Sequence, residues 1–148
     1  MKFDGIAIGG SQGRNHAELE VLLNWLVPEI KKRSDRPIHL LGLADEKSIR
    51  LGVKLGIDTF DSCFPTRLTR RGTLLTESGK AHVKNKKFVK SYYVPIEEGC
   101  RCNVFKGGCD MAYLNHLFKA NEVNFINLAI SHNVYWMDTM MKDIRVNC

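Results

Sequence analysis

Three short apolar segments recur along the first 61 residues at positions that predict buried strands. They cover residues 3–8, 38–41 and 57–60, and each is followed by a glycine or an aspartate. Apolar runs of this length are typical of strands that other elements cover on both sides. We therefore expect three short strands, with Asp61 at the end of the third.

Two amphipathic segments separate these strands and predict helices. Residues 16–33 place apolar side chains at helical spacing, although Pro28 should kink or end that helix. A second helix should begin after Asp45, whose side chain can cap it, and should stop at Gly56. The order strand, helix, strand, helix, strand predicts an α/β fold with parallel strands and crossover helices.

The pattern changes beyond the third strand. Residues 72–76 and 81–84 predict a small hairpin, and a turn rich in cysteine follows at residues 100–109. Helical periodicity returns at residues 111–120 and again at residues 123–144. We expect the hairpin and the cysteine turn to form an insertion on the α/β unit.

The composition fits one soluble, cytoplasmic domain. The chain has 148 residues, which is enough to bury a core, and it carries no run of 18 apolar residues and no secretory signal. Its net charge of +6 and the cluster of Arg67, Arg70 and Arg71 favour a polyanionic partner such as nucleic acid. An ordinary solvated loop is the alternative for this cluster.

The five cysteines favour a metal site over disulfide bonds. Their odd number, without a secretory signal, argues against a disulfide framework. Cys100, Cys102 and Cys109 lie within ten positions of one another, a grouping that is typical of metal ligands.

The strand ends carry the candidate chemistry, because ligands of parallel α/β folds bind at the carboxyl ends of strands. Glycines such as Gly5 and Gly42 would let a planar ligand approach the backbone there, although tight turns alone would also explain them. Asp61 taken in isolation would most simply cap a helix. Strand alternation places Asp58 on the opposite side from Asp61, so we interpret Asp58 as structural.

A longer string around Asp61 carries a specific resemblance. Residues 56–67 read GIDTFDSCFPTR, which resembles the string GVDMFDCVLPTR of the tRNA-guanine transglycosylase family. The resemblance continues upstream into the strands at residues 5–9 and 39–42, in a form similar to that of chlamydial relatives. It continues downstream through the hairpin, Cys100 and Cys102 to His132. The resemblance thus covers nearly the whole chain, with the matching segments in the same order as in the family.

The resemblance implies a fold and an activity. The fold is part of a (β/α)₈ TIM barrel, here its last three strands (residues 1–72), followed in one continuous unit by a zinc-binding insertion subdomain and C-terminal helices (residues 73–148). The activity is exchange of guanine at the tRNA wobble position for queuine or a 7-deazaguanine precursor, through a covalent aspartyl-ribose intermediate. A full barrel takes about 250 residues. We therefore expect the chain to need a missing N-terminal half and to be inactive alone, with a homodimer expected for the complete enzyme.

The resemblance also assigns roles to individual residues. Asp61 matches the nucleophile, which a neighbouring Arg67 or Arg70 would help keep ionised. The base-binding positions are Gly5, Ile6, Ala7, Leu41 and Gly42. The positions that hold the tRNA anticodon loop are Gly42, Leu43, Ala44, Asp45, Glu46, Lys47 and Ser48, together with Arg67, Leu68, Thr69, Arg70 and Arg71.

Zinc is the implied cofactor, and here the chain departs from the family pattern. Cys100, Cys102 and His132 match three ligands of a structural Zn²⁺ site, but Phe105 stands where the family has a third cysteine. Closed structural zinc sites have four ligands. Cys109 could take the fourth position, because Gly107 and Gly108 loosen the turn before it; otherwise the site has three ligands or is empty.

Other functions remain open alternatives at this stage. The first is a non-catalytic tRNA-binding or dimer-partner subunit of the same superfamily, although such relatives tend to lose the nucleophile that Asp61 retains. A small zinc module unrelated to tRNA is the other. Gly10 stands where many bacterial relatives have glutamate, and the resemblance includes both queuine and its precursors as the incoming base.

Overall fold

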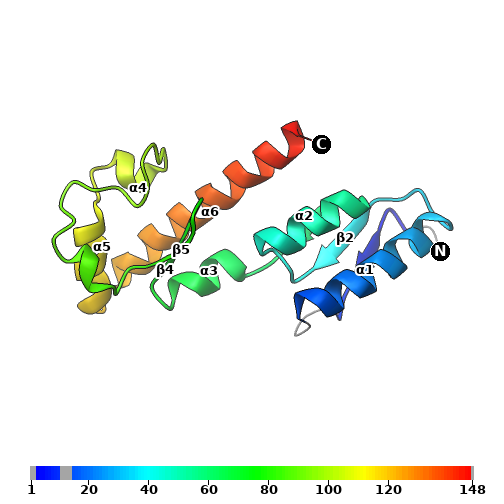
Figure 1. The fold of residues 1–148 in the computed structure, drawn as a ribbon, viewed down its shortest axis with the longest axis horizontal. Coiled ribbons are helices and arrows are strands. Elements are labelled where there is room, and N and C mark those ends of the chain that lie inside the picture. Colours follow the sequence, from blue (N-terminus) through cyan, green and yellow to red (C-terminus); the bar gives the residue numbers. More distant parts are fainter. Residues whose placement is uncertain (1–2, 11–14, 148) are drawn as a thin grey trace. The chain divides into compact units, whose positions relative to one another are not determined.

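The computed structural model describes residues 3–10 and 15–147 and divides the chain into two compact units. The first unit is Met1–Phe64 and the second is Pro65–Cys148. Figure 1 shows both units with most of their elements labelled, and each unit is described below by itself. Cys148, one of the five cysteines, lies outside the described residues.

The first unit is a three-stranded parallel sheet with two crossover helices. Its strands are β1 (Ile6–Ile8), β2 (Ile38–Leu41) and β3 (Thr59–Asp61), and they lie side by side in the order β1-β2-β3. Helices α1 (His16–Lys31) and α2 (Glu46–Leu55) connect them. This arrangement confirms the expected α/β fold with alternating strands and helices.

Local signals explain where the two helices begin and end. Asn15 and Glu18 form a reciprocal capping box at the start of α1. Asp45 accepts a hydrogen bond from the Ser48 backbone N–H at the start of α2, and Gly56 ends that helix in the left-handed conformation with φ 86°. Both signals of α2 agree with the sequence.

Proline does not end α1. The helix continues past Pro28 to Lys31, and the carbonyl of Pro28 accepts the backbone N–H of Lys32 at 3.0 Å. A proline inside a helix costs one backbone hydrogen bond. Val27, beside it, is fully buried against the sheet, and this packing offsets the loss.

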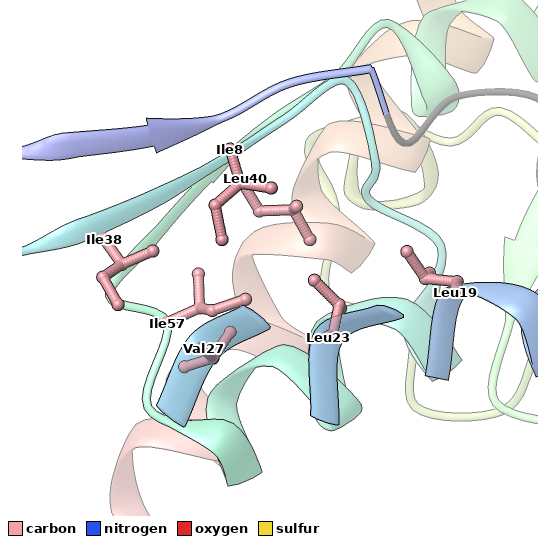
Figure 2. Close-up of a cluster of buried hydrophobic side chains, with 7 residues drawn as sticks. All are labelled: Ile8, Leu19, Leu23, Val27, Ile38, Leu40 and Ile57. Atoms are coloured by element: carbon pink, nitrogen blue, oxygen red, sulfur yellow. The ribbon is translucent and has the colours of Figure 1, made fainter. Parts of the chain in front are cut away.

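The core of the first unit lies between α1 and one face of the sheet. Figure 2 shows Leu19, Leu23 and Val27 pointing from α1 toward the strands. The strand side chains that meet them are Ile8, Ile38 and Leu40, with Ile57 from the segment before β3. Strand alternation leaves the opposite face of the same strands open, and Ala7, Leu41 and Asp61 are exposed there.

The second unit combines a hairpin with helices. Helix α3 (Phe64–Thr69) leads into the antiparallel strands β4 (Thr73–Thr76) and β5 (Gly79–His82). The hairpin is confirmed, although its second strand begins at Gly79, two residues before the expected start. Its further elements are the 3₁₀ turn η1 (Lys86–Phe88), α4 (Asn103–Lys106), α5 (Met111–Lys119) and α6 (Val123–Val146).

Helices α5 and α6 confirm the two stretches of helical periodicity. Leu74, Met111 and Leu114 are fully buried and, with Leu117 and Phe125, form the core of this unit. Throughout the described residues, no helix is both long and apolar enough to cross a membrane.

A buried asparagine joins the hairpin to the long helix. The side-chain oxygen of Asn133 in α6 accepts the backbone N–H of Leu75 at 2.8 Å. Its amide nitrogen donates to the carbonyls of Pro65 (3.0 Å) and Thr73 (3.1 Å). Because Asn133 is fully buried, these bonds fix the register of α6 against β4, and with it the position of the neighbouring His132.

Candidate functional site

Asp61 occupies the last position of β3, on the open face of the sheet. Its side chain is 58% exposed. Oδ1 lies 3.1 Å from Nε2 of His39 on β2 and accepts the backbone N–H of Gly42, also at 3.1 Å. Among the described residues, no hydrogen bond is recorded for Oδ2. The carboxylate is thus held at the carboxyl end of the sheet through one oxygen, while most of the side chain stays exposed.

Asp58 has a different environment, as strand alternation predicts. Its Oδ2 accepts the backbone N–H of Ile38 at 2.8 Å, while its own N–H donates to the Ile38 carbonyl at 2.9 Å. Asp58 therefore fastens the segment before β3 to the beginning of β2. This is the structural role expected for it.

The residues with a predicted role in base binding lie on the two strands next to Asp61. Leu41 is the register partner of Asp61, is 40% exposed, and is followed by Gly42 with φ 76°. On β1, Ile6 and Ala7 pair with Ile38 and His39 of β2. The strand ends therefore bring Leu41, Gly42 and Asp61 together, while β1 lies one strand further away.

The first predicted tRNA-binding segment, residues 42–48, forms the loop after β2 and the start of α2. Two of its members serve the helix start: the Ser48 hydroxyl donates to Asp45 at 2.6 Å, and Ser48 is buried. Ala44 is buried as well, whereas Glu46 and Lys47 are exposed. Only the exposed members of this segment can contact a large ligand without rearrangement.

The second predicted tRNA-binding segment, residues 67–71, belongs to the other unit. It covers the end of α3 and the turn before β4, and Arg67, Arg70 and Arg71 are exposed there. Thr69 is fully buried and its hydroxyl donates to the Thr66 carbonyl at 2.7 Å. Three guanidinium groups on one turn form a surface suited to phosphate or base edges.

A possible metal centre in the second unit consists of Cys100, Cys102 and His132. Their ligand atoms all lie within 4.8 Å of one another. Nδ1 of His132 is 3.5 Å from Sγ of Cys102 and 3.8 Å from Sγ of Cys100. Tetrahedral zinc with ordinary bond lengths would place a sulfur and a nitrogen ligand about 3.6 Å apart. The spacing of these three side chains therefore fits a tetrahedral ion.

The hydrogen bond on the far side of the His132 ring also suits a metal ligand. Nε2 of His132 lies 2.8 Å from the Leu75 carbonyl, to which it can only donate. That bond leaves the lone pair of Nδ1 directed at the two thiols, as in metal-bound histidines. His132 and Cys102 are both fully buried, so the donor set is fixed by packing.

The two thiols differ in their acidity. Burial raises the pKa of Cys100 to about 11, and its hydrogen bond to the Cys102 side chain adds to this effect. Burial also acts to raise the pKa of Cys102, but the hydrogen bond with His132 and the Phe105 backbone outweigh it and lower that pKa below its ordinary value. Cys102 is therefore the thiol that more readily supplies a thiolate to a cation.

Phe105 lies beside the three candidate ligands. Its ring meets the His132 ring edge-on, with centroids 5.7 Å apart. Cys109, half-buried after the turn at Gly107 and Gly108, does not belong to the group of three ligands within the described residues. A role for Cys109 as the fourth ligand stays a prediction.

Sequence reasoning missed two members of the Asp61 site. His39 and Thr59 are register partners on the same open face as Asp61, and Thr59 Oγ1 lies 2.8 Å from Nδ1 of His39. The available signal was strand alternation, which places residues 39 and 41, and likewise 59 and 61, on one face.

The chain thus combines an α/β unit that holds a carboxylate at its strand ends with a second unit that carries a Cys-Cys-His group. The family model described as Queuine tRNA-ribosyltransferase matches residues 1–147. The chain belongs to this family.

Individual relatives agree with this assignment. The chain is 41% identical over 145 residues to the queuine tRNA-ribosyltransferase of Protochlamydia amoebophila, a match that covers 98% of this chain and 36% of that protein. Enzymes of the same name from Chlamydia felis (41% over 143 residues) and Chlamydia trachomatis (41% over 145 residues) are matched over 38% of their length. The chain therefore spans little more than a third of these relatives.

Proposed function

We propose that this chain forms the carboxy-terminal, nucleophile-bearing part of a tRNA-guanine transglycosylase. The observation that carries the proposal is the Asp61 carboxylate, which is anchored through one oxygen at the end of β3 while most of the side chain stays exposed. The substrates would be the anticodon loop of a tRNA and queuine or a 7-deazaguanine precursor, and the work would take place in the cytoplasm.

The reaction would proceed by two displacements at one ribose carbon. An oxygen of Asp61 attacks C1′, the bond from C1′ to the guanine nitrogen breaks, and guanine leaves with the electron pair and takes up a proton. The incoming base then loses its ring N–H proton, its nitrogen bonds to C1′, and the Asp61 carboxylate departs. Two inversions retain the sugar configuration.

Partial-barrel architecture belongs to the same proposal. The β1-β2-β3 sheet is parallel and has both helices against one face, which supports three βα units of a (β/α)₈ barrel. An upstream half would supply the remaining strands. We assign residues 1–72 to the barrel and residues 73–148 to the zinc-binding insertion and closing helices. The upstream half and homodimer formation are further parts of this proposal.

Zinc is the metal that the Cys100, Cys102 and His132 group fits best. Two thiolates and one imidazole form a borderline-soft donor set, and the spacing of about 3.6 Å expected for tetrahedral zinc matches the separations of 3.5 and 3.8 Å. The ion would fasten the segment at the start of α4 to α6, and it would have no part in the displacement chemistry.

A trapping experiment with matched aspartate variants tests the catalytic role. The chain is combined with the upstream portion of a chlamydial relative, incubated with tRNA, and examined on denaturing gels for a covalent protein–RNA adduct. We expect Asp61→Asn to abolish the adduct. Asp58→Asn should retain it, because the amide oxygen can still accept the Ile38 N–H.

Two other results would contradict the proposal. An adduct that survives in Asp61→Asn would remove Asp61 from the chemistry. Binding of tRNA by the wild-type chain, without any adduct or guanine exchange in the reconstituted protein, would favour a non-catalytic tRNA-binding or dimer-partner subunit.

A further inference from the structure

His39 lies on the open face of the sheet and uses both of its ring nitrogens. Nδ1 is 2.8 Å from Oγ1 of Thr59, its register partner on β3, and Nε2 is 3.1 Å from Oδ1 of Asp61. The His39 side chain is 32% exposed, so the ring is partly enclosed but reachable from solvent. Thr59, His39 and Asp61 form a connected row across two neighbouring strands.

The chemistry of the partners decides which nitrogen carries the proton. An ionised carboxylate only accepts hydrogen bonds, so Nε2 must donate to Asp61. The Thr59 hydroxyl can donate to the lone pair of Nδ1, which completes a neutral ring protonated on Nε2. Thr59 thus selects the tautomer of His39 that can donate to Asp61. Hydrogen-bond partners fix the tautomer of metal-bound and catalytic histidines in the same way.

Two donors meet on the same oxygen of Asp61. Nε2 of His39 and the Gly42 backbone N–H both lie 3.1 Å from Oδ1. A carboxylate held by two donors on one oxygen cannot rotate freely about its Cβ–Cγ bond. The direction of Oδ2 is therefore restrained as well.

We propose that His39 is a positioning residue that holds Asp61 with Oδ2 directed at the ribose carbon. This inference rests on the proposed transglycosylase function and adds a role for a residue outside its nucleophile and base-binding set. The same N–H groups favour the free carboxylate over the ester, so they also assist the departure of Asp61 in the second displacement.

A matched pair of amide substitutions tests the two ring nitrogens of His39 separately. Glutamine places its amide nitrogen close to the position of Nε2, so His39→Gln preserves a donor for Asp61. Asparagine reaches only the position of Nδ1, so His39→Asn preserves a polar group for Thr59 alone. Both variants are uncharged amides, so a difference between them reports the contact with Asp61.

The first measurement needs only this chain. Long-range ¹H–¹⁵N spectra of the histidine rings report which nitrogen of His39 is protonated in the neutral ring. We expect Nε2–H in the wild type, and a shift toward the mixed tautomers of a free histidine in both Asp61→Ala and Thr59→Val. A wild-type ring protonated on Nδ1, or a spectrum unchanged in Asp61→Ala, would overturn the proposal.

The second measurement uses the protein reconstituted with the upstream portion. At saturating tRNA, His39→Asn should slow formation of the covalent adduct about 10- to 100-fold, because misplacing a reacting group by an ångström costs on that order. His39→Gln should recover most of the rate, and tRNA affinity should stay within about threefold of wild type for both. Equal adduct rates in the two variants and the wild type would overturn the positioning role.

Failure of the proposed function gives a distinct pattern. If the wild-type protein forms no adduct, the transglycosylase assignment fails. The ring spectra then test the structural claim that His39 donates a hydrogen bond to Asp61. A proton on Nε2 that is lost from this position in Asp61→Ala and Thr59→Val supports the claim, and any other pattern refutes it.

Discussion

Truncation of Asn133 to alanine should destabilise the second unit by an amount that its hydrogen bonds predict. The substitution would leave the Leu75 N–H buried without its partner, at a cost of about 1–3 kcal/mol. It also removes the bonds to the Pro65 and Thr73 carbonyls, each worth about 0.5–1.5 kcal/mol. We therefore expect a loss of roughly 4 kcal/mol in the free energy of unfolding, which is a large part of the stability of a typical domain.

Urea denaturation followed by far-UV circular dichroism measures this loss. Asn147→Ala is the matched control, since Asn147 follows the same helix and is exposed, and its side-chain amide donates to the Asp143 carbonyl. The control should change the free energy of unfolding by less than about 0.5 kcal/mol. A loss below about 1 kcal/mol for Asn133→Ala would refute the inference that this side chain fixes α6 against the hairpin.

Two further predictions concern the turn before the hairpin and the metal centre. Gly72→Ala should cost roughly 2 kcal/mol or more in chemical denaturation, because φ is 66° and a Cβ would lie 2.8 Å from the Phe118 ring. Gly99→Ala is the matched control, because φ is 77° there and nothing lies within 4 Å of the added Cβ. It should cost less, and equal costs would contradict the role of the ring. Phe105→Cys adds a fourth ligand and should raise the zinc affinity at least about 10-fold over the Phe105→Leu control, as measured in competition with a chelating dye. Cys109→Ser should leave the zinc affinity within about threefold of wild type. A drop in Cys109→Ser would show that Cys109 already supplies the fourth ligand.

The helices and strands followed closely from the sequence where local signals were strong. The cap at Asp45 and the stop at Gly56 mark both ends of α2, and apolar periodicity marks α5 and α6. Strand β3 is shifted toward Asp61, because the Ile57 N–H still bonds to the Gly52 carbonyl at the end of α2. Together with the bond from the Gly56 N–H to the Val53 carbonyl, this bond forms a Schellman motif, which Gly56 signals locally but which the apolar run at residues 57–60 does not reveal.

The candidate site was predictable in part. The position of Asp61 at a strand end followed from the chain order, whereas its bonds to His39 and Gly42 depend on the register between β2 and β3, which the sequence leaves open. The metal group brings the neighbouring Cys100 and Cys102 together with His132, which lies 30 or more positions further along the chain. Only the resemblance to a family predicted that convergence, since spacing pointed to the cysteines without the histidine.

The most direct test of the account is mass spectrometry of the reconstituted protein after reaction with tRNA and nuclease digestion. The account predicts that the peptide containing Asp61 carries the added mass of a ribose-linked fragment, attached through an ester that hydroxylamine cleaves. A ribose fragment on any other residue, or none on a protein that still exchanges guanine, would contradict it.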